Sequence, residues 1–289
     1  ILIIGAGPAG LTAGFKLMKK KDFIIIEKNS KYVGGISRTE KYKNFKFDIG
    51  GHRFFSKSKE INELWDQILP NDIILRKRSS RILFKNKFYS YPLKPIQALL
   101  NLGFYESFLV VVSYLKAKIF KNKNIKTYQD WVVDKFGKRL FKNFFETYTE
   151  KVWGIKCNEI SSDWAAQRIK GLDLKKLIIN SFIKKKNKNI KTLINEFKYP
   201  RKGPGMLWES ARDQIINNGI KIFMNANAYE YQYFEESKFW KVKCKIDNED
   251  YEIDCNQIIN SAPLKDVVNN ITPVLKNKSE AKSLNYRDF

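Results

Sequence analysis

Three glycines near the start of the chain follow an apolar run at a fixed spacing. The run from Ile1 to Ile4 leads directly into Gly5, Gly7 and Gly10, in the order G-x-G-x-x-G. The first glycine permits a tight turn, the second admits a pyrophosphate against the backbone, and the third lets a helix pack closely on a strand. The N-terminus of that helix offers N–H groups and a positive dipole end to phosphates. The start of the chain is therefore predicted to bind a dinucleotide.

A second apolar run, FIIIE, ends in Glu27. An acid about 20 residues after the glycines, at the end of the second strand, is placed to accept hydrogen bonds from a ribose. Strand, helix and strand in this order predict a parallel sheet in an α/β fold of Rossmann type. These features alone fit a nicotinamide-dependent dehydrogenase as well as a flavoprotein.

Two more glycine pairs follow, in GGISRT from Gly34 to Thr39 and in GGHRFF from Gly50 to Phe55. A nicotinamide site does not require a second glycine pair with an arginine so soon after the ribose acid. The two segments therefore favour FAD over NAD. The alternative is that they form ordinary turns with solvated arginines.

These segments resemble the flavin-binding superfamily of amine oxidases, protoporphyrinogen oxidase, phytoene desaturase and UDP-galactopyranose mutase. The resemblance implies that FAD is the cofactor. It further implies that the backbone of the turn at Gly34 and Gly35, called the GG turn below, runs along the FAD with Arg38 near its phosphates. It also implies that His52 lies beside the flavin as the candidate catalytic residue; a packing role is the alternative. The strand at 226–228 would pass the adenine. The expected cofactor-binding residues are Gly5, Gly7, Pro8, Ala9, Gly10, Glu27, Lys28, Gly34, Gly35, Ser37, Arg38, Gly51, His52, Arg53 and Ala228.

The segment FFETYTEKVWG, residues 144–154, is similar to a stretch that lines the nucleotide end of the substrate pocket in UDP-galactopyranose mutases. By this resemblance Phe144 and Tyr148 would flank a uracil ring, Trp153 would face the sugar-diphosphate, and Arg168 would approach the diphosphate. Phe144 and Tyr148 are four residues apart, so we expect them to share one helix face. Aromatic rings stack on bases and a guanidinium forks onto phosphate. The alternative is an aromatic stripe buried in the core.

The segment 96–195 is predicted to be mainly helical, because its apolar residues recur at spacings of three and four. The block that follows reads as a loop, a helix and strands. Together with the resemblance, this predicts a Rossmann-like FAD-binding domain, discontinuous in sequence, with a mainly helical inserted substrate domain. We also expect a fragment, because the superfamily's C-terminal FAD-contacting turn is not found. The predicted boundaries are 1–75 and 200–270 for the FAD-binding domain, 76–199 for the substrate domain, and 271–289 for a return to the substrate domain.

The chain is strongly basic, with a formal net charge of +24. Its lysines fall in short runs without interleaved aromatics or a nucleic-acid-binding motif, so nucleic acid is not an expected partner. A basic surface favours an anionic small-molecule substrate, such as a UDP-sugar, and leaves contact with an anionic membrane open. The most apolar run, residues 108–115, is far shorter than the ~20 residues that span a bilayer. Because Glu106 and Lys116 bound it, we predict a buried helix and no transmembrane segment.

The cysteines, Cys157, Cys244 and Cys255, are odd in number and scattered, which indicates reduced thiols and a cytoplasmic location. His52 is the only histidine, which excludes a multi-histidine metal site, and no metal is expected. No nucleophile motif such as G-x-S-x-G is found either. This absence is consistent with a reaction carried by the cofactor.

Besides a nicotinamide-only dehydrogenase, which the GGISRT turn disfavours, three functions therefore remain open. The first is an FAD-dependent oxidoreductase that passes a hydride from its substrate to flavin N5. The second is a mutase-like flavoenzyme that isomerises a UDP-sugar through reduced flavin N5, in a sugar-nucleotide or polysaccharide pathway. The third is an inactive remnant that binds a flavin or a partner.

Overall fold

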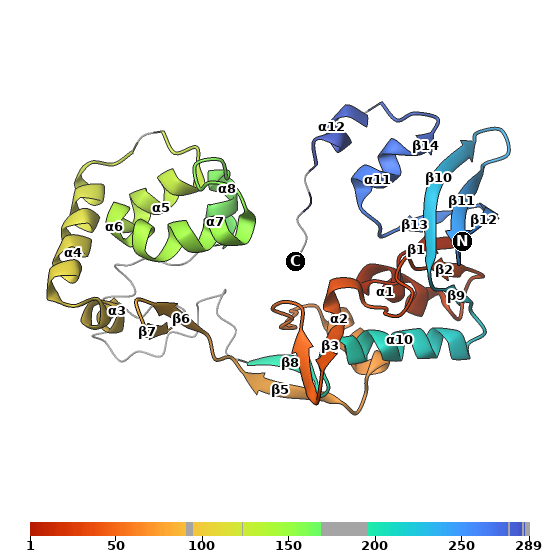
Figure 1. Cartoon of the computed structure of the whole chain (residues 1–289), viewed down its shortest axis with the longest axis horizontal. Helices are drawn as coiled ribbons and strands as arrows, with labels where there is room; N and C mark the ends of the chain where they lie inside the picture. Colours follow the sequence, from red (N-terminus) through yellow and green to blue (C-terminus); the bar gives the residue numbers. More distant parts are fainter. Residues whose placement is uncertain (91–94, 123, 169–195, 277, 285, 287–289) are drawn as a thin grey trace. The chain divides into compact units, whose positions relative to one another are not determined.

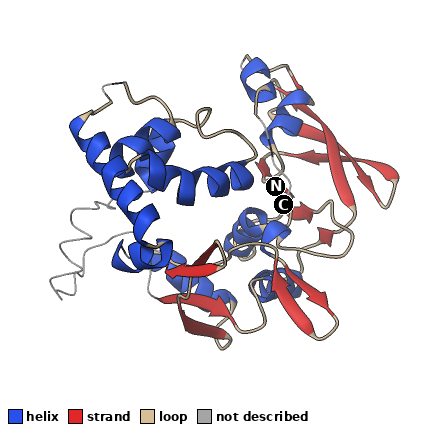
Figure 2. Ribbon diagram, turned by 60° about the vertical axis from the view of Figure 1, so that its left-hand side comes forward, coloured by secondary structure: helices blue, strands red, loops and turns tan. Residues whose placement is uncertain are grey.

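The computed structural model describes residues 1–90, 95–122, 124–168, 196–276, 278–284 and 286. The chain divides into two compact units, one formed by residues 1–76 with 196–289 and the other by residues 77–195. Figure 1 labels the elements along the chain, and helices make up most of the described part of the second unit (Figure 2).

The first unit is built on a parallel sheet in the order β13-β1-β2-β9. Its registers place Ile3 of the central strand β1 beside Ile25 of β2 on one side and Ile259 of β13 on the other. Strands β9 and β13 follow the second unit in the sequence, whereas β1 and β2 precede it, so the sheet is discontinuous in sequence. The predicted α/β fold with a parallel sheet is confirmed. The strands are β1 (Leu2–Ile4), β2 (Ile24–Ile26), β9 (Ile222–Phe223) and β13 (Ile258–Asn260).

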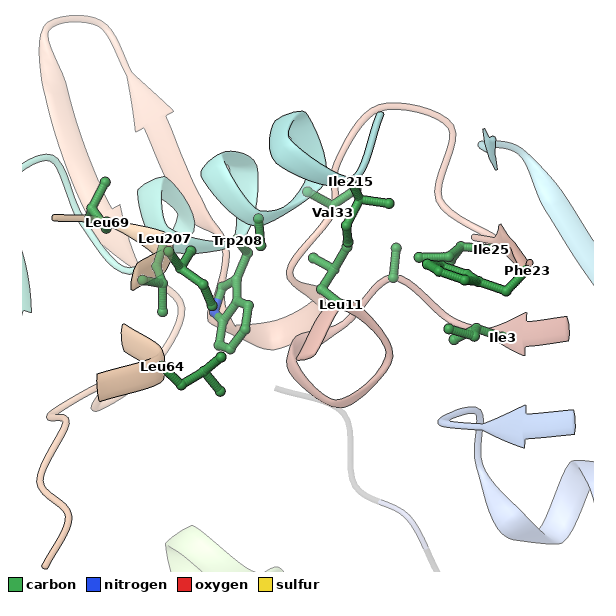
Figure 3. Packing of buried hydrophobic residues seen from close by; sticks show 13 residues of the cluster. Ile3, Leu11, Phe23, Ile25, Val33, Leu64, Leu69, Leu207, Trp208 and Ile215 are labelled. Carbon is green, nitrogen blue, oxygen red and sulfur yellow. The ribbon is translucent and has the colours of Figure 1, made fainter. Parts of the chain in front are cut away.

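One face of this sheet packs on helices. Ile3 and Ile25 point into a buried cluster with Leu11 of α1 and Ile215 of α10 (Figure 3). The cluster extends through Trp208 to α2. Parallel sheets are covered on both faces, so alternate residues of each strand enter different cores. The helices are α1 (Pro8–Leu17), α2 (Lys59–Ile68) and α10 (Gly205–Asn217).

The other face packs on an antiparallel sheet in the order β12-β11-β10-β14. Leu2 and Ile4 of β1 meet Val242 and Cys244 of β11 in a second buried cluster. The run YEIDCNQIIN contains two strands in different sheets, because β12 ends at Cys255 and β13 joins the parallel sheet. The antiparallel strands are β10 (Ala226–Phe234), β11 (Phe239–Ile246), β12 (Glu249–Cys255) and β14 (Ile271–Thr272).

Shorter elements complete the first unit. A hairpin of β3 and β4 follows the GG turn. Strand β8, which begins at residue 196, pairs with β5 and so returns the chain to the first unit. These elements are η1 (Gly35–Ser37), β3 (Thr39–Tyr42), β4 (Phe45–Asp48), β5 (Ile73–Lys77), β8 (Glu196–Pro200), α11 (Leu264–Asn269) and α12 (Lys278–Lys282).

The second unit joins a β-hairpin to helices around a core that includes Tyr89, Val132 and Phe141. Within the segment predicted to be mainly helical, the last helix observed runs from 162 to 168, and residues 169–195 lie outside the described residues. The elements are β6 (Arg81–Phe84), β7 (Lys87–Ser90), α3 (Pro95–Leu102), α4 (Phe104–Ile119), α5 (Tyr128–Phe136), α6 (Lys138–Phe141), the π-helix η2 (Lys142–Glu146), α7 (Thr147–Trp153) and α8 (Ser162–Arg168).

The apolar run 108–115 forms a helix as expected, but the prediction that this helix is buried is wrong. Val110 is buried, whereas Phe104 is 92% exposed and Phe108 is 59% exposed. The run is apolar around most of the helix, and one side alone can face the neighbouring helices α3, α5 and α6. The surplus apolar side chains therefore meet solvent.

The carboxylate of Glu106, on the inner side of α4, connects this helix to α6 and η2 through hydrogen bonds. Both oxygens of Glu106 accept hydrogen bonds from Arg139, at 2.6 and 2.7 Å, and Asn143 donates to the same carboxylate at 2.8 Å. The hydrogen bonds from Arg139 are the main cause that lowers the pKa of Glu106 to about 2.

We expect Glu106→Gln to lower the free energy of unfolding at pH 7 by about 1–3 kcal/mol, the scale of a charge-assisted hydrogen bond. The folded pKa of Glu106 lies below its unfolded value of 4.5, so its stabilisation is present above that value and disappears as the pH falls towards about 2. Urea unfolding at several pH values measures this. Glu63→Gln, in an exposed pair with Lys59, is the matched control and should change stability by less than about 0.5 kcal/mol. Equal effects of the two variants at pH 7 would contradict the prediction.

Candidate cofactor site

Three strands end together at one edge of the parallel sheet. Gly5 follows β1, Glu27 follows β2 and Ser261 follows β13. The N–H of Gly5 donates to the carbonyl of Ile26 at 2.8 Å, and the N–H and hydroxyl of Ser261 both donate to the carbonyl of Ile4 at 2.8 Å. Because β2 and β13 lie on opposite sides of β1, this edge is a switch point, where open α/β sheets bind their ligands.

The first glycine motif has the geometry that its spacing predicts. Gly5 has a φ of +94°, and a Cβ on Gly10 would collide with the carbonyl oxygen of Gly5. Gly7 precedes α1 with an ordinary φ of −76°, and a Cβ placed on it would meet nothing within 4 Å. Pro8 occupies the first turn of α1, where a missing N–H costs nothing, and Ala9 is exposed beside it. The space over Gly7 is therefore open in front of a helix N-terminus.

The carboxylate of Glu27 binds backbone N–H groups at the same edge of the sheet. One carboxylate oxygen accepts from the N–H of Ala6 at 2.6 Å and the other from the N–H of Asn29 at 2.8 Å. Each oxygen keeps a further lone pair, so the carboxylate can still accept from a ribose hydroxyl. The next residue, Lys28, is exposed.

The GG turn lies directly against the first motif. The N–H of Gly34 donates to the carbonyl of Ala6 at 2.8 Å, and a Cβ on Gly35 would lie 3.6 Å from the Cα of Gly7. Gly34 has a φ of +89°, and a Cβ on it would lie 3.2 Å from Trp208. Trp208 was not predictable, because no local pattern connects a residue of α10 to a turn so far away in the chain.

His52 contains an unpartnered buried nitrogen. Its Nδ1 lies 3.3 Å from the hydroxyl of Ser37, whereas its Nε2 is buried and has no hydrogen-bond partner within the described residues. Buried polar atoms of this kind are rare and call for a partner. A bound ligand with a polar atom at this position would supply one. Gly51, next to it, has nothing within 4 Å of an added Cβ.

The two predicted arginines have partners in the protein. Arg38 forms an ion pair with Glu40 and lies over the ring of Tyr32, 5.7 Å from its centroid. Arg53 lies over the ring of Phe197 at 5.8 Å. Ala228 is half-buried in β10, the strand that begins with a hydrogen bond from Ala226 to the carbonyl of Glu27.

Residues after position 195 contact the hairpin of β3 and β4, which follows the turn at Gly34 and Gly35. The hydroxyl of Tyr199 donates to Asp48 at 2.6 Å; burial, and then this hydrogen bond, raise the pKa of Tyr199. The N–H of Gly205 donates to the hydroxyl of Thr39 at 2.9 Å, and a Cβ on Gly205 would lie 2.5 Å from the N of Thr39. No local pattern in the sequence predicts these contacts, because they join segments that are more than 150 positions apart.

The residues predicted to bind substrate belong to the second unit. Phe144 is 8% exposed and packs on Tyr89, with ring centroids 5.0 Å apart, whereas Tyr148 is 71% exposed. The two rings therefore lie in different environments: Phe144 is in the π-helix η2 and inside the core, as in the alternative of a buried aromatic stripe, whereas Tyr148 is in α7 and meets solvent. Trp153 is part-exposed at the end of α7 and contacts Trp164. Arg168 is the last residue of α8.

Comparison with known proteins agrees with this fold. Residues 3–68 match the family model of the NAD(P)-binding Rossmann-like domain. The structure of a reduced UDP-galactopyranose mutase is similar with a TM-score of 0.79 and 20% identity, over 99% of this chain and 60% of that one. An oxidoreductase from Methanosarcina mazei matches with a TM-score of 0.58 and 15% identity, over 97% of this chain and 63% of that one. A putrescine oxidase redesigned in cofactor binding matches with a TM-score of 0.59 and 15% identity, over 96% of this chain and 61% of that one.

The chain therefore has a Rossmann-like dinucleotide-binding domain and the fold of the flavin-type oxidoreductases and mutases that its sequence resembles. It spans about 60% of the length of the mutase structure. Within the described residues, no helix is long and apolar enough to cross a membrane.

Proposed function

We propose that this chain binds FAD and is part of a flavin-dependent oxidoreductase that acts on an anionic small molecule. The observation that carries the proposal is the open space over Gly7, in front of the N-terminus of α1 and beside the GG turn. The unpartnered Nε2 of His52 supports it independently, because it requires a polar partner from outside the described residues. When bound, FAD would supply a site that accepts or donates a hydride.

The roles of the protein's own residues follow from their geometry. The N–H groups at the start of α1 would bind the pyrophosphate, and Glu27 would accept from the ribose. Backbone of Gly34 and Gly35 would run along the cofactor. His52 would donate or accept a hydrogen bond through Nε2, and Ser37 would orient its ring. We further propose that residues 77–195 form the substrate domain and that the protein works in the cytoplasm, where its free cysteines stay reduced.

The test uses the full-length protein purified with its bound flavin. Anaerobic mixing with candidate anionic molecules that carry a C–H hydride donor should bleach the oxidised flavin absorbance for the correct substrate class. Purification without flavin, together with no FAD binding on reconstitution, would refute the proposal. A tightly bound nicotinamide instead would make the chain a dehydrogenase.

A second function, isomerisation of a UDP-sugar, is favoured by one observation. The fold match to UDP-galactopyranose mutase has a TM-score of 0.79, against 0.59 for putrescine oxidase. Titration with UDP and UDP-galactose, in the oxidised and the dithionite-reduced protein, distinguishes the two functions. Binding that tightens on reduction supports the mutase, and no response with the flavin intact supports the oxidoreductase.

If the second function holds, Tyr148→Ala should weaken UDP binding by about 1–3 kcal/mol, the scale of base stacking on an aromatic ring. Tyr148 is largely exposed, so its ring is free to stack and its loss should not disturb the core. The matched control is Tyr105→Ala, which removes another largely exposed tyrosine of the second unit. Calorimetry measures both affinities. An unchanged affinity in Tyr148→Ala would remove this residue from the pocket.

A further inference from the structure

Helix α4 carries an apolar stripe on the side that faces away from its own unit. The stripe consists of Phe104, Phe108, Val111, Leu115 and Ile119, all of which are exposed. Their spacing of three and four residues places them along one face of the helix. A continuous exposed apolar surface of this length is unusual in a protein that meets only water.

Polar contacts fix which side of α4 points outward. Glu106 binds Arg139, the hydroxyl of Ser107 donates to the carbonyl of Leu99 at 2.6 Å, and the hydroxyl of Ser113 accepts from the N–H of Arg139 at 3.0 Å. Val110 is buried between these positions. Because this anchored side faces α3, α5 and α6, the helix cannot turn its apolar stripe inward. Figure 1 shows α4 along the edge of this unit, with α3 at its N-terminal end.

The charges around the stripe indicate what covers it. Between residues 77 and 122 the sequence holds nine lysines and arginines and a single acid, Glu106, which is already paired. Lys116 and Lys121 are exposed on and just after the last turns of α4. A second copy of this chain would bring like charges together, whereas an anionic lipid surface would neutralise them.

We infer that α4 docks on the surface of an anionic membrane, with its apolar stripe in the interfacial layer and its lysines at the lipid headgroups. The helix has 16 residues and lies in the plane of the bilayer rather than across it. An apolar face with flanking lysines is the pattern of such interfacial helices. This docking is independent of the reaction proposed above.

The test is sedimentation of the full-length, flavin-loaded protein with large vesicles, either of phosphatidylcholine alone or with about one third phosphatidylglycerol. We expect binding to the anionic vesicles at low salt and much weaker binding to the neutral ones. Phe104→Gln with Phe108→Gln should reduce partitioning about tenfold or more, because less apolar surface is buried. Lys116→Gln with Lys121→Gln should reduce it about 30-fold on anionic vesicles, and this effect should shrink at high salt.

Matched controls come from the first unit. Ile216→Gln removes an exposed apolar side chain of α10, and Lys19→Gln with Lys20→Gln removes two exposed lysines. Both should leave vesicle binding unchanged, and circular dichroism with urea unfolding shows that every variant is folded. No binding to anionic vesicles, or equal losses in the controls, would overturn the proposal. So would a dimer in light scattering that Phe104→Gln with Phe108→Gln dissociates, because a second copy would then cover the stripe.

Discussion

Gly7→Val is expected to abolish retention of FAD while the protein stays folded. The isopropyl group would fill the open space over Gly7 where we propose that the pyrophosphate lies, and the affinity for FAD should fall about 100-fold or more. The fold should tolerate valine, because the φ of −76° is ordinary and an added Cβ meets nothing within 4 Å. A change at this N-cap costs about 1 kcal/mol at most. Flavin absorbance per mole of purified protein and urea unfolding measure the two effects.

Gly7→Ala is the graded control, because a methyl group occupies less of the same space and should weaken FAD binding less than valine does. Normal flavin content in the valine variant would refute the position of the cofactor. Loss of flavin together with loss of the folded protein would show that Gly7 has a structural role instead. The pairing of flavin content with stability therefore separates binding from folding at this position.

The part of the fold that was predictable depends on local backbone requirements. Gly5 and Gly10 have roles that any strand–turn–helix unit imposes, so their spacing was sufficient to predict the parallel sheet. The acid at Glu27 follows from the same unit. The contact between the GG turn and the first motif was predictable only through the resemblance, since the hydrogen bond from Gly34 to Ala6 crosses 28 positions.

What was not predictable depends on the amount of surface that tertiary packing covers. Apolar content predicted a buried helix at 108–115, but burial requires neighbours on every side, and the outward face of α4 has none in the described structure. Likewise, the spacing of Phe144 and Tyr148 could not predict that one ring is buried and the other exposed, and a π-helix cannot be read from residue types. The packing of Trp208 against Gly34 is a contact between distant segments, and no local pattern encodes it.

Gly10→Ala is expected to be the most destabilising single methyl group in the first unit. Its Cβ would overlap the carbonyl oxygen of Gly5 and lie 3.3 Å from Ile3. A backbone oxygen in a tight turn cannot move aside as a side chain can. Helix α1 would have to shift from β1, at a cost of about 3 kcal/mol or more. This is a large share of the 5–15 kcal/mol that typically stabilises a domain, so yield and unfolding midpoint should both fall.

Gly14→Ala, one turn further along α1, is the matched control. Its Cβ would meet the side-chain ends of Ile25 at 2.9 Å and Ile215 at 3.1 Å. Such ends can rotate, and alanine gains about 1 kcal/mol of helix propensity over glycine, so the net effect should be small. Urea unfolding of the two variants at equal protein concentration makes the comparison. Equal midpoints would show that α1 does not need the close approach at Gly10, and that its glycine serves the ligand rather than the fold.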